Sequence, residues 1–153
     1  LLDYGSGFGL LYDFLRRLGQ RPRYTGFDFV PAMTAKGVEM HPANPDCSFT
    51  VDEASLAPVD YVIASGIFNI RLETPELAWR DYVVSILERI NGLALKGFAF
   101  NMLTSYSDPE YMKTHLYYAD PCFFFDLCKR RYSKSVALLH DYGLYDFTIL
   151  VRK

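Results

Sequence analysis

Three glycines at alternating positions are the residues most suggestive of chemistry in this sequence. Gly5, Gly7 and Gly9 follow the apolar run Leu1 to Tyr4, and apolar residues at helical spacing follow over 11–18. Glycine has no Cβ, so a glycine-rich turn can bend sharply and approach a ligand closely. Ligands of open parallel sheets bind beyond the carboxyl ends of the strands. The order strand, turn, helix therefore predicts a ligand site here, although an ordinary tight turn would also explain the glycines alone.

A carboxylate at the end of the second apolar segment indicates what the ligand contains. Asp28 closes the segment Arg23 to Asp28 and stands 23 positions after Gly5. One carboxylate can accept hydrogen bonds from both hydroxyls of a ribose, which favours an adenosine-type ligand such as NAD or S-adenosylmethionine. The NAD pattern G-x-G-x-x-G/A is not met, because its third position is Leu10. No G-K-[ST] follows the turn, which excludes a phosphate-binding P-loop.

The order of the predicted elements indicates how these residues are positioned. Strands alternate with helices, as is typical of a mostly parallel sheet covered on both faces. The link 142–145 is too short for a parallel crossover, so its flanking strands should pair antiparallel. We expect an α/β fold in three layers, with a seven-stranded sheet whose C-terminal strand is antiparallel. The expected strands are 1–4, 23–28, 48–51, 60–65, 97–103, 135–141 and 146–152, and the expected helices are 11–18, 31–40 and 75–90, with further helix starts at Asp108 and Asp120.

Length and composition limit the classes of protein that need to be considered. The 153 residues suit one domain, over 1–153, and we expect that the chain begins inside its first strand and lacks a native N-terminal segment. A net charge of −2 gives no general field for binding nucleic acid or an anionic membrane. An odd number of cysteines, three, with no C-x-x-C pair, argues against disulfides or a zinc site and favours the cytoplasm.

Taken together, the motifs resemble those of class I S-adenosylmethionine-dependent methyltransferases, a family with a Rossmann-like three-layer fold. The run Leu1-Leu2-Asp3-Tyr4-Gly5-Ser6-Gly7-Phe8-Gly9 resembles the family's acid-x-G-x-G-x-G motif. Tyr24-Thr25-Gly26-Phe27-Asp28 is similar to its second-strand ending. The segments 48–54, 60–69 and 142–153 resemble its third-strand acid, its fourth strand and its reversed seventh strand. The resemblance covers nearly the whole chain.

The resemblance implies that S-adenosylmethionine is the cofactor and assigns residues to its methionine and ribose parts. Asp3 would orient the loop or hold the methionine ammonium. The loop Gly5-Ser6-Gly7 would pass close to the cofactor, and Asp28 would hold the ribose.

The remaining assignments concern the adenine and the methyl end. Phe29 would cover the adenine face, and Asp52, alone or with Glu53, would bind the adenine edge. The sequence does not choose between these two acids. Ser65 and Gly66 would offer backbone groups near the methionine.

The acceptor of the methyl group is less well indicated. Methyl transfer from a sulfonium needs position more than a conspicuous catalytic constellation, and no metal-ligand spacing appears. The segment 104–132 is rich in aromatic residues and lies where the family often builds its substrate cover, so a pocket for a small, partly apolar acceptor is one interpretation. Packing of the helices on the sheet is the other. His115 is the candidate base by location, whereas we expect His41, in a loop before Pro42, to be exposed.

The chain therefore predicts methyl transfer to an oxygen, nitrogen or carbon atom of a small molecule. The run Ser65-Gly66-Ile67-Phe68-Asn69 lacks the N/D-P-P-Y/F signature of methyltransferases that act on exocyclic amines of nucleic-acid bases. We expect neither a nucleic-acid partner nor a membrane partner. The alternatives are an NAD-dependent oxidoreductase and a non-catalytic scaffold of the same fold.

Overall fold

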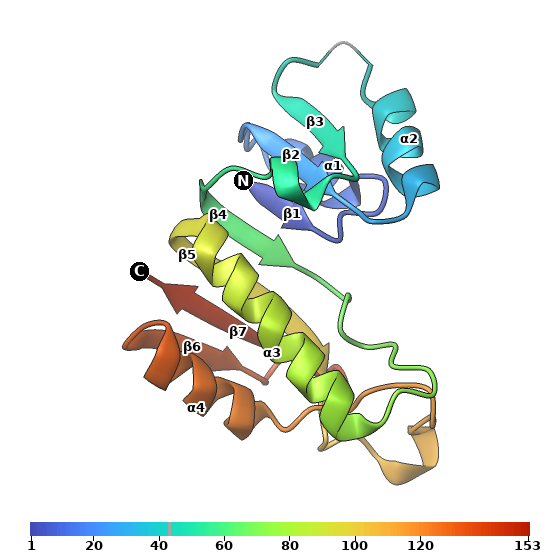
Figure 1. Ribbon diagram of the computed structural model, residues 1–153, viewed down its shortest axis with the longest axis vertical. Helices are drawn as coiled ribbons and strands as arrows, with labels where there is room; N and C mark the ends of the chain where they lie inside the picture. Colours follow the sequence, from blue (N-terminus) through green and yellow to red (C-terminus); the bar gives the residue numbers. More distant parts are fainter. Residues whose placement is uncertain (43) are drawn as a thin grey trace.

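The computed structural model describes residues 1–42 and 44–153 and contains one seven-stranded sheet (Figure 1). The strand order across the sheet is β3-β2-β1-β4-β5-β7-β6. The strands are β1 (Leu2–Tyr4), β2 (Tyr24–Phe27), β3 (Cys47–Thr50), β4 (Val59–Ala64), β5 (Ala94–Leu103), β6 (Ser135–Leu139) and β7 (Asp146–Arg152).

The strand directions confirm the predicted sheet. Strands β3, β2, β1, β4 and β5 pair in parallel, and β7 runs antiparallel to both β5 and β6. The chain builds outward from β1 to β2 and β3, and then returns to place β4 on the other side of β1. Such a reversal leaves a crevice at the carboxyl ends of the two central strands, where ligands of this architecture bind.

In the described part of the chain, four α-helices flank the sheet: α1 (Leu10–Arg17), α2 (Pro31–Met40), α3 (Glu76–Leu93) and α4 (Pro121–Arg131). Figure 1 shows α3 and α4 on one face of the half formed by β4 to β7, with α1 and α2 beside β1 to β3. Two of the prolines predicted to begin helices do so, Pro31 in α2 and Pro121 in α4, whereas Pro75 is the N-cap residue that precedes α3 (Glu76–Leu93). At α4 the Asp120 carboxylate also accepts a hydrogen bond from the Cys122 backbone N–H at 2.8 Å, which caps the helix.

Some predicted boundaries were wrong. The helix start at Asp108 gives only a three-residue 3₁₀ helix, Pro109–Tyr111. The connection after β3 is too short for a full helix, and it holds a 3₁₀ turn, Glu53–Ser55. Helix α3 continues through Asn91-Gly92 to Leu93, because Ile90 and its neighbours pack on the sheet and tertiary contact outweighs the low helix propensity of glycine.

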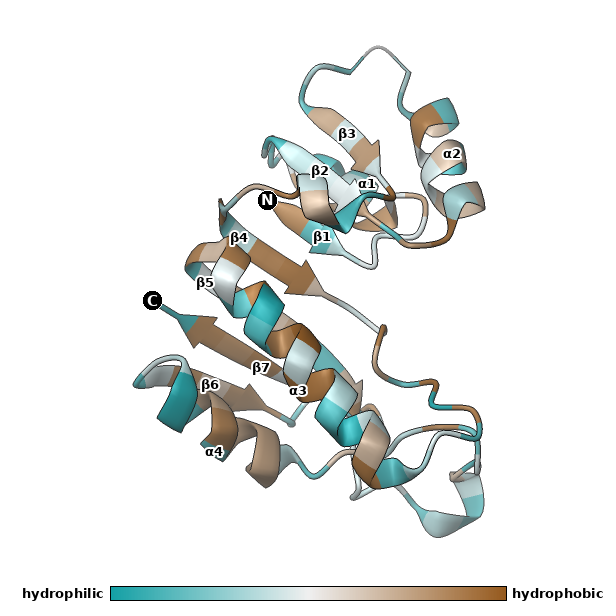
Figure 2. Cartoon of the chain, in the orientation of Figure 1, coloured by the Kyte–Doolittle hydropathy of each residue, from teal (hydrophilic) through white to brown (hydrophobic). Residues whose placement is uncertain are grey.

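The core lies between the sheet and the α3–α4 layer. Val83, Leu87 and Ile90 of α3 are fully buried against Phe98 and Phe100 of β5. Burying each such side chain contributes about 2 kcal/mol. Figure 2 shows β4 and β7 mostly in the brown of hydrophobic residues.

The opposite face of the sheet is more open. A groove of about 580 Å³ there is lined mainly by apolar side chains, among them Tyr61, Ile63 and Leu150. Within the described residues, no helix combines the length and the apolar character that a membrane crossing needs.

Candidate functional site

The glycine-rich loop is fixed to the end of β2 by backbone groups. Gly5 N–H and Ser6 N–H both donate to the carbonyl oxygen of Phe27, at 2.7 and 2.9 Å. Gly5 has φ 87° and Gly7 has φ 54°, a left-handed conformation that residues with a Cβ rarely adopt. The turn therefore depends on glycine for its backbone path.

The glycines of this turn differ in what surrounds them. A Cβ on Gly5 would lie 2.1 Å from Cγ2 of Ile67, and a Cβ on Gly9 would lie 2.7 Å from the Phe49 ring. A Cβ on Gly7 would meet no heavy atom within 4 Å. Gly5 and Gly9 are thus required by packing inside the protein, whereas Gly7 borders open space.

Asp28 lies directly after β2 and is held from two sides. Its Oδ2 accepts a hydrogen bond from Gly7 N–H at 2.9 Å, and its Oδ1 accepts one from Val30 N–H at 2.9 Å. The residue is 9% exposed. An ionised carboxylate has about four acceptor positions, so each oxygen keeps capacity for another donor. The ring of Phe29 next to it is exposed.

Asp3, at the centre of β1, is buried beneath the loop. Its Oδ2 accepts a hydrogen bond from the hydroxyl of Tyr24 at 2.6 Å. The pKa of Asp3 is raised to about 6 as the net result of three causes: burial raises it most, the hydrogen bond from Tyr24 lowers it, and the nearby charge of Asp28 raises it. No sequence pattern pointed to Tyr24 as this partner, since the two residues are 21 positions apart.

The two acids that the sequence left open have different environments. Glu53 accepts a hydrogen bond from the Tyr4 hydroxyl and pairs with Arg89 Nε at 3.0 Å. Asp52 is exposed and uses Oδ1 to accept the Ala54 N–H at 3.0 Å. Asp52 is therefore the acid of this pair that is available to a ligand.

The turn after β4 carries the exposed residues Ser65 and Gly66. Gly66 N–H donates to Asn101 Oδ1 at 2.8 Å, and Asn101 Nδ2 donates to Asp146 Oδ2 at 2.9 Å. The other oxygen of Asp146 is buried and has no hydrogen-bond partner among the described residues. Sequence reasoning missed Asn101 and Asp146, because no local motif joins residues 35 and 45 positions apart.

A comparison with curated proteins identifies the family. "Putative methyltransferase Rv1506c" of Mycobacterium tuberculosis (strain ATCC 25618 / H37Rv) is 49% identical over 151 residues, which cover 99% of this chain and 91% of that protein. The chain belongs to the methyltransferases. No protein-family model matches it.

Solved structures show which methyltransferase fold this is. Magnesium protoporphyrin IX methyltransferase (ChlM) from Synechocystis PCC 6803, with bound SAM and with bound SAH, gives TM-scores of 0.67 and 0.69 at 16% identity, over 99% of this chain and 69% and 73% of that chain. The Pnkp1/Rnl/Hen1 RNA repair complex gives a TM-score of 0.69 at 17% identity, over 99% of this chain and 37% of that chain. The shared fold and the family together confirm the expectation of a class I S-adenosylmethionine-dependent methyltransferase.

The residues of this methyltransferase at the crevice fit that cofactor. Gly7 and Gly66 follow the neighbouring strands β1 and β4, between which the chain order reverses, and a Cβ on either would meet no protein atom within 4 Å. Asp28, at the same edge, keeps acceptor capacity for ribose hydroxyls. Open space, backbone able to come close to a ligand and a fixed carboxylate are what an adenosine-type ligand requires.

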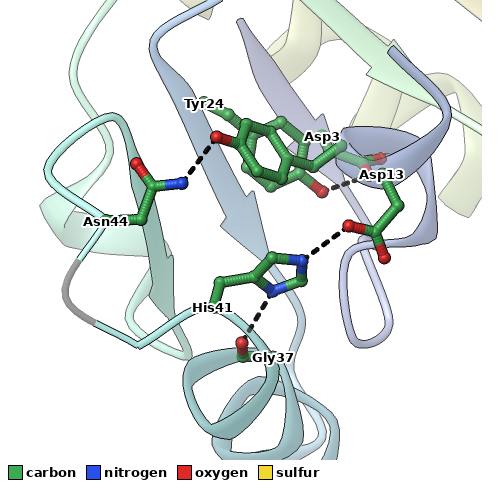
Figure 3. Close-up of polar contacts among 7 residues, drawn as sticks. Asp3, Asp13, Tyr24, Gly37, His41 and Asn44 are labelled. Carbon is green, nitrogen blue, oxygen red and sulfur yellow. Dashed lines mark hydrogen bonds and ion pairs between the residues drawn. The ribbon is translucent and has the colours of Figure 1, made fainter. Parts of the chain in front are cut away.

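The prediction for His41 was wrong. Its ring is 8% exposed, and it joins two helices: Nδ1 contacts the carbonyl oxygen of Gly37 in α2 and Nε2 contacts Oδ1 of Asp13 in α1, both at 2.9 Å (Figure 3). The ring also stacks on Phe49. Because a carbonyl oxygen can only accept, Nδ1 carries a proton. The residue is structural, and the loop signal from Pro42 did not show that the chain folds it back onto α1.

The candidate base His115 lies in the segment after β5, where it was expected. Its ring is exposed, and its carbonyl oxygen accepts the N–H groups of Arg71 and Leu72, both at 3.0 Å. The backbone of His115 therefore ties the segment after β5 to the turn after β4.

Proposed function

We propose that this enzyme transfers the methyl group of S-adenosylmethionine to an oxygen, nitrogen or carbon atom of a small-molecule acceptor. The observation that carries the proposal is the position of Asp28, fixed by Gly7 N–H and Val30 N–H next to the point where the strand order reverses. Methyltransferase membership supplies the reaction type.

In this proposal the chain contributes binding and position. Bound S-adenosylmethionine supplies an electrophilic methyl group on a sulfonium. Asp28 accepts the ribose hydroxyls, and the loop Gly5-Ser6-Gly7 lets the backbone lie along the cofactor. Asp3 lies below that loop and offers negative charge to the methionine ammonium.

The remaining proposed contacts lie at the adenine and methyl ends. Phe29 covers the adenine face, and Asp52 rather than Glu53 meets the adenine edge, because Glu53 is already engaged by Tyr4 and Arg89. At the methyl end, Ser65 and the carbonyl oxygen of Gly66 contact the methionine part of the cofactor. The N–H of Gly66 does not, since it already donates to Asn101. His115 stays a proposed base, to be tested by substitution.

A small-molecule acceptor is supported by the charge and by the aromatic cover. The net charge of −2 provides no field for a polyanion. Tyr106, Tyr111 and His115 are exposed around the carboxyl edge, where they can pack on an acceptor. Free thiols at Cys47, Cys122 and Cys128 favour the cytoplasm as the proposed compartment.

Calorimetric titration with S-adenosylhomocysteine and with NAD, followed by an acceptor screen, tests the proposal. We expect the first ligand alone to bind, and S-adenosylhomocysteine to be released with members of a panel of small phenols, amines and carboxylic acids but not with bulk tRNA. Asp28→Ala should weaken the binding of S-adenosylhomocysteine about 100-fold and lower its release accordingly, while Asp81→Ala, at an exposed acid on α3, should leave both signals unchanged. Methylation of tRNA alone, or binding of NAD alone, would overturn the proposal.

A further inference from the structure

A cavity lies at the carboxyl edge, between the turn after β4 and the segment after β5. Its volume is about 370 Å³. The two segments are joined by a bridge between Ile70 and Leu116 and by the N–H groups of Arg71 and Leu72, which donate to the His115 carbonyl oxygen. The lining includes the polar residues Arg71, Glu76, Ser105, Lys113, Thr114, Tyr117 and Tyr118.

Arg71 is fixed in the wall of this cavity by backbone oxygens. Its Nε donates to the carbonyl oxygen of Leu116 at 3.1 Å, and its Nη1 donates to that of Thr74 at 2.8 Å. The residue is half-buried. Of the ion pairs formed within residues 1–42 and 44–153, none involves Arg71. A guanidinium has five N–H groups, so this cation retains donors and has no acidic partner.

The backbone around Arg71 is held in an unusual conformation. Leu72 has φ 52°, the one positive φ among the non-glycine residues described. Such a conformation costs on the order of 1 kcal/mol and persists only where surrounding contacts determine it. Here the Thr74 N–H donates to the Arg71 carbonyl oxygen at 3.0 Å, and His115 holds the other side. The position of the guanidinium is thus set before any ligand arrives.

The other charges on the cavity wall leave it net positive. The backbone N–H of Lys113 donates to the Tyr118 hydroxyl at 3.0 Å, and the ammonium of Lys113 takes part in none of the ion pairs of the described segments. Glu76 is the one acid in the lining. Two unpaired cations against one carboxylate, in a chain of net charge −2, mark a local preference for an anion.

We propose that this cavity binds an anionic oxygen group of the acceptor, a carboxylate or a phosphate, through Arg71 and Lys113. A planar guanidinium with free N–H groups is suited to either group. The cavity is linked to the methyl end by Asn69, which stands between Gly66 and Arg71 and whose Oδ1 accepts the Leu103 N–H at 3.1 Å. As a statement about the acceptor, the inference rests on the proposed methyl transfer.

Titration of the ¹⁵N-labelled chain with inorganic phosphate and, separately, with acetate tests the site by NMR at constant ionic strength. We expect saturable shifts of the amides of Arg71, Leu116 and Tyr118. The affinity should fall by at least about tenfold in Arg71→Gln and about threefold in Lys113→Gln, because a charge-assisted hydrogen bond is lost in each. The matched control Arg16→Gln, an exposed arginine on α1, should bind as the parent does. The anion that binds more tightly identifies the group.

Shifts that do not saturate by about 50 mM, or that weaken equally in Arg16→Gln, would overturn the site. Should Arg71→Gln disturb the fold by circular dichroism, Lys113→Gln and Arg71→Lys carry the same test, since the second keeps the charge and loses the planar fork. Calorimetry with S-adenosylhomocysteine on the same samples separates the two proposals. If the anion binds and S-adenosylhomocysteine does not, the anion site is supported and the proposed methyl transfer is rejected. If S-adenosylhomocysteine binds and the anion does not, only the anion site is rejected.

Discussion

At the carboxyl edge beside β1 to β3, backbone N–H groups hold a carboxylate, whereas beside β4 to β7 a side-chain amide adds to the backbone bonds made by His115. In the first region Gly7 N–H and Val30 N–H fix Asp28. In the second, the amide of Asn101 links Gly66 to Asp146. Backbone donors remain when side chains change, provided that φ is permitted. We therefore expect the region beside β1 to β3, the proposed cofactor region, to tolerate no substitution at a few positions. The region beside β4 to β7, the proposed acceptor region, can change its specificity by substitution.

The largest effect should come from Asp28→Ala. This substitution removes the carboxylate that Gly7 N–H and Val30 N–H hold in the proposed cofactor region, beside β1 to β3. We expect S-adenosylhomocysteine to bind about 100-fold more weakly, because a charged acceptor and its hydrogen bonds are lost. Isothermal calorimetry measures this, with Asp81→Ala as the control. A loss of affinity below about fivefold would show that backbone groups alone bind the cofactor. The contrast between the two regions would then not hold.

Gly5→Ala tests whether the loop depends on packing as well as on φ. The added Cβ would lie 2.1 Å from Ile67 Cγ2, in the turn that belongs to the acceptor region. We expect a loss of about 3 kcal/mol in the free energy of unfolding, measured by urea denaturation. Gly19→Ala is the matched control, since Gly19 has φ 77° and no atom within 4 Å of its Cβ position. It should lose only about 1 kcal/mol.

Asp3→Asn separates stability from binding within the cofactor region. Because burial raises the pKa of Asp3 from 3.8 to about 6, the folded chain binds more protons than the unfolded chain between these values. Stability therefore falls as the pH rises through this window, and the loss is complete above it. Asparagine does not titrate in this range, so the variant should not show this loss. From pH 4 to pH 7 the free energy of unfolding of the parent should therefore fall by about 2 kcal/mol relative to that of the variant.

Denaturation of the parent and Asp3→Asn at both pH values checks this expectation. If Asp3 also faces the methionine ammonium, the more stable variant will bind S-adenosylhomocysteine more weakly. Identical pH profiles for the two proteins would mean that Asp3 is not the titrating group.

Asn101→Ala should have the smallest effect on the cofactor. It frees Gly66 N–H and leaves Asp146 Oδ2 without its donor. We expect S-adenosylhomocysteine affinity to fall about fivefold, because water can replace the lost contact at the exposed turn. A loss as large as that of Asp28→Ala would show that the two regions act as one.

Particular residues show how far the sequence could be interpreted. The glycine turn, Asp28 and the reversed strand β7 were predicted correctly in position, because each depends on a local pattern or on a short link. The environment of Glu53 was not predictable, since its partners Tyr4 and Arg89 come from distant segments. The same holds for His41, whose neighbour Pro42 suggested an exposed loop.

The sequence by itself determined the alternation of strands and helices, the family and the glycine-rich loop, because periodic burial and positive φ leave local signatures. Tertiary structure decided the rest. It placed Tyr24 against Asp3, Asn101 against Gly66 and Arg71 in the wall of a cavity. These contacts join residues that no motif connects, and the burial and charge that give them their chemistry exist only after the sheet has assembled.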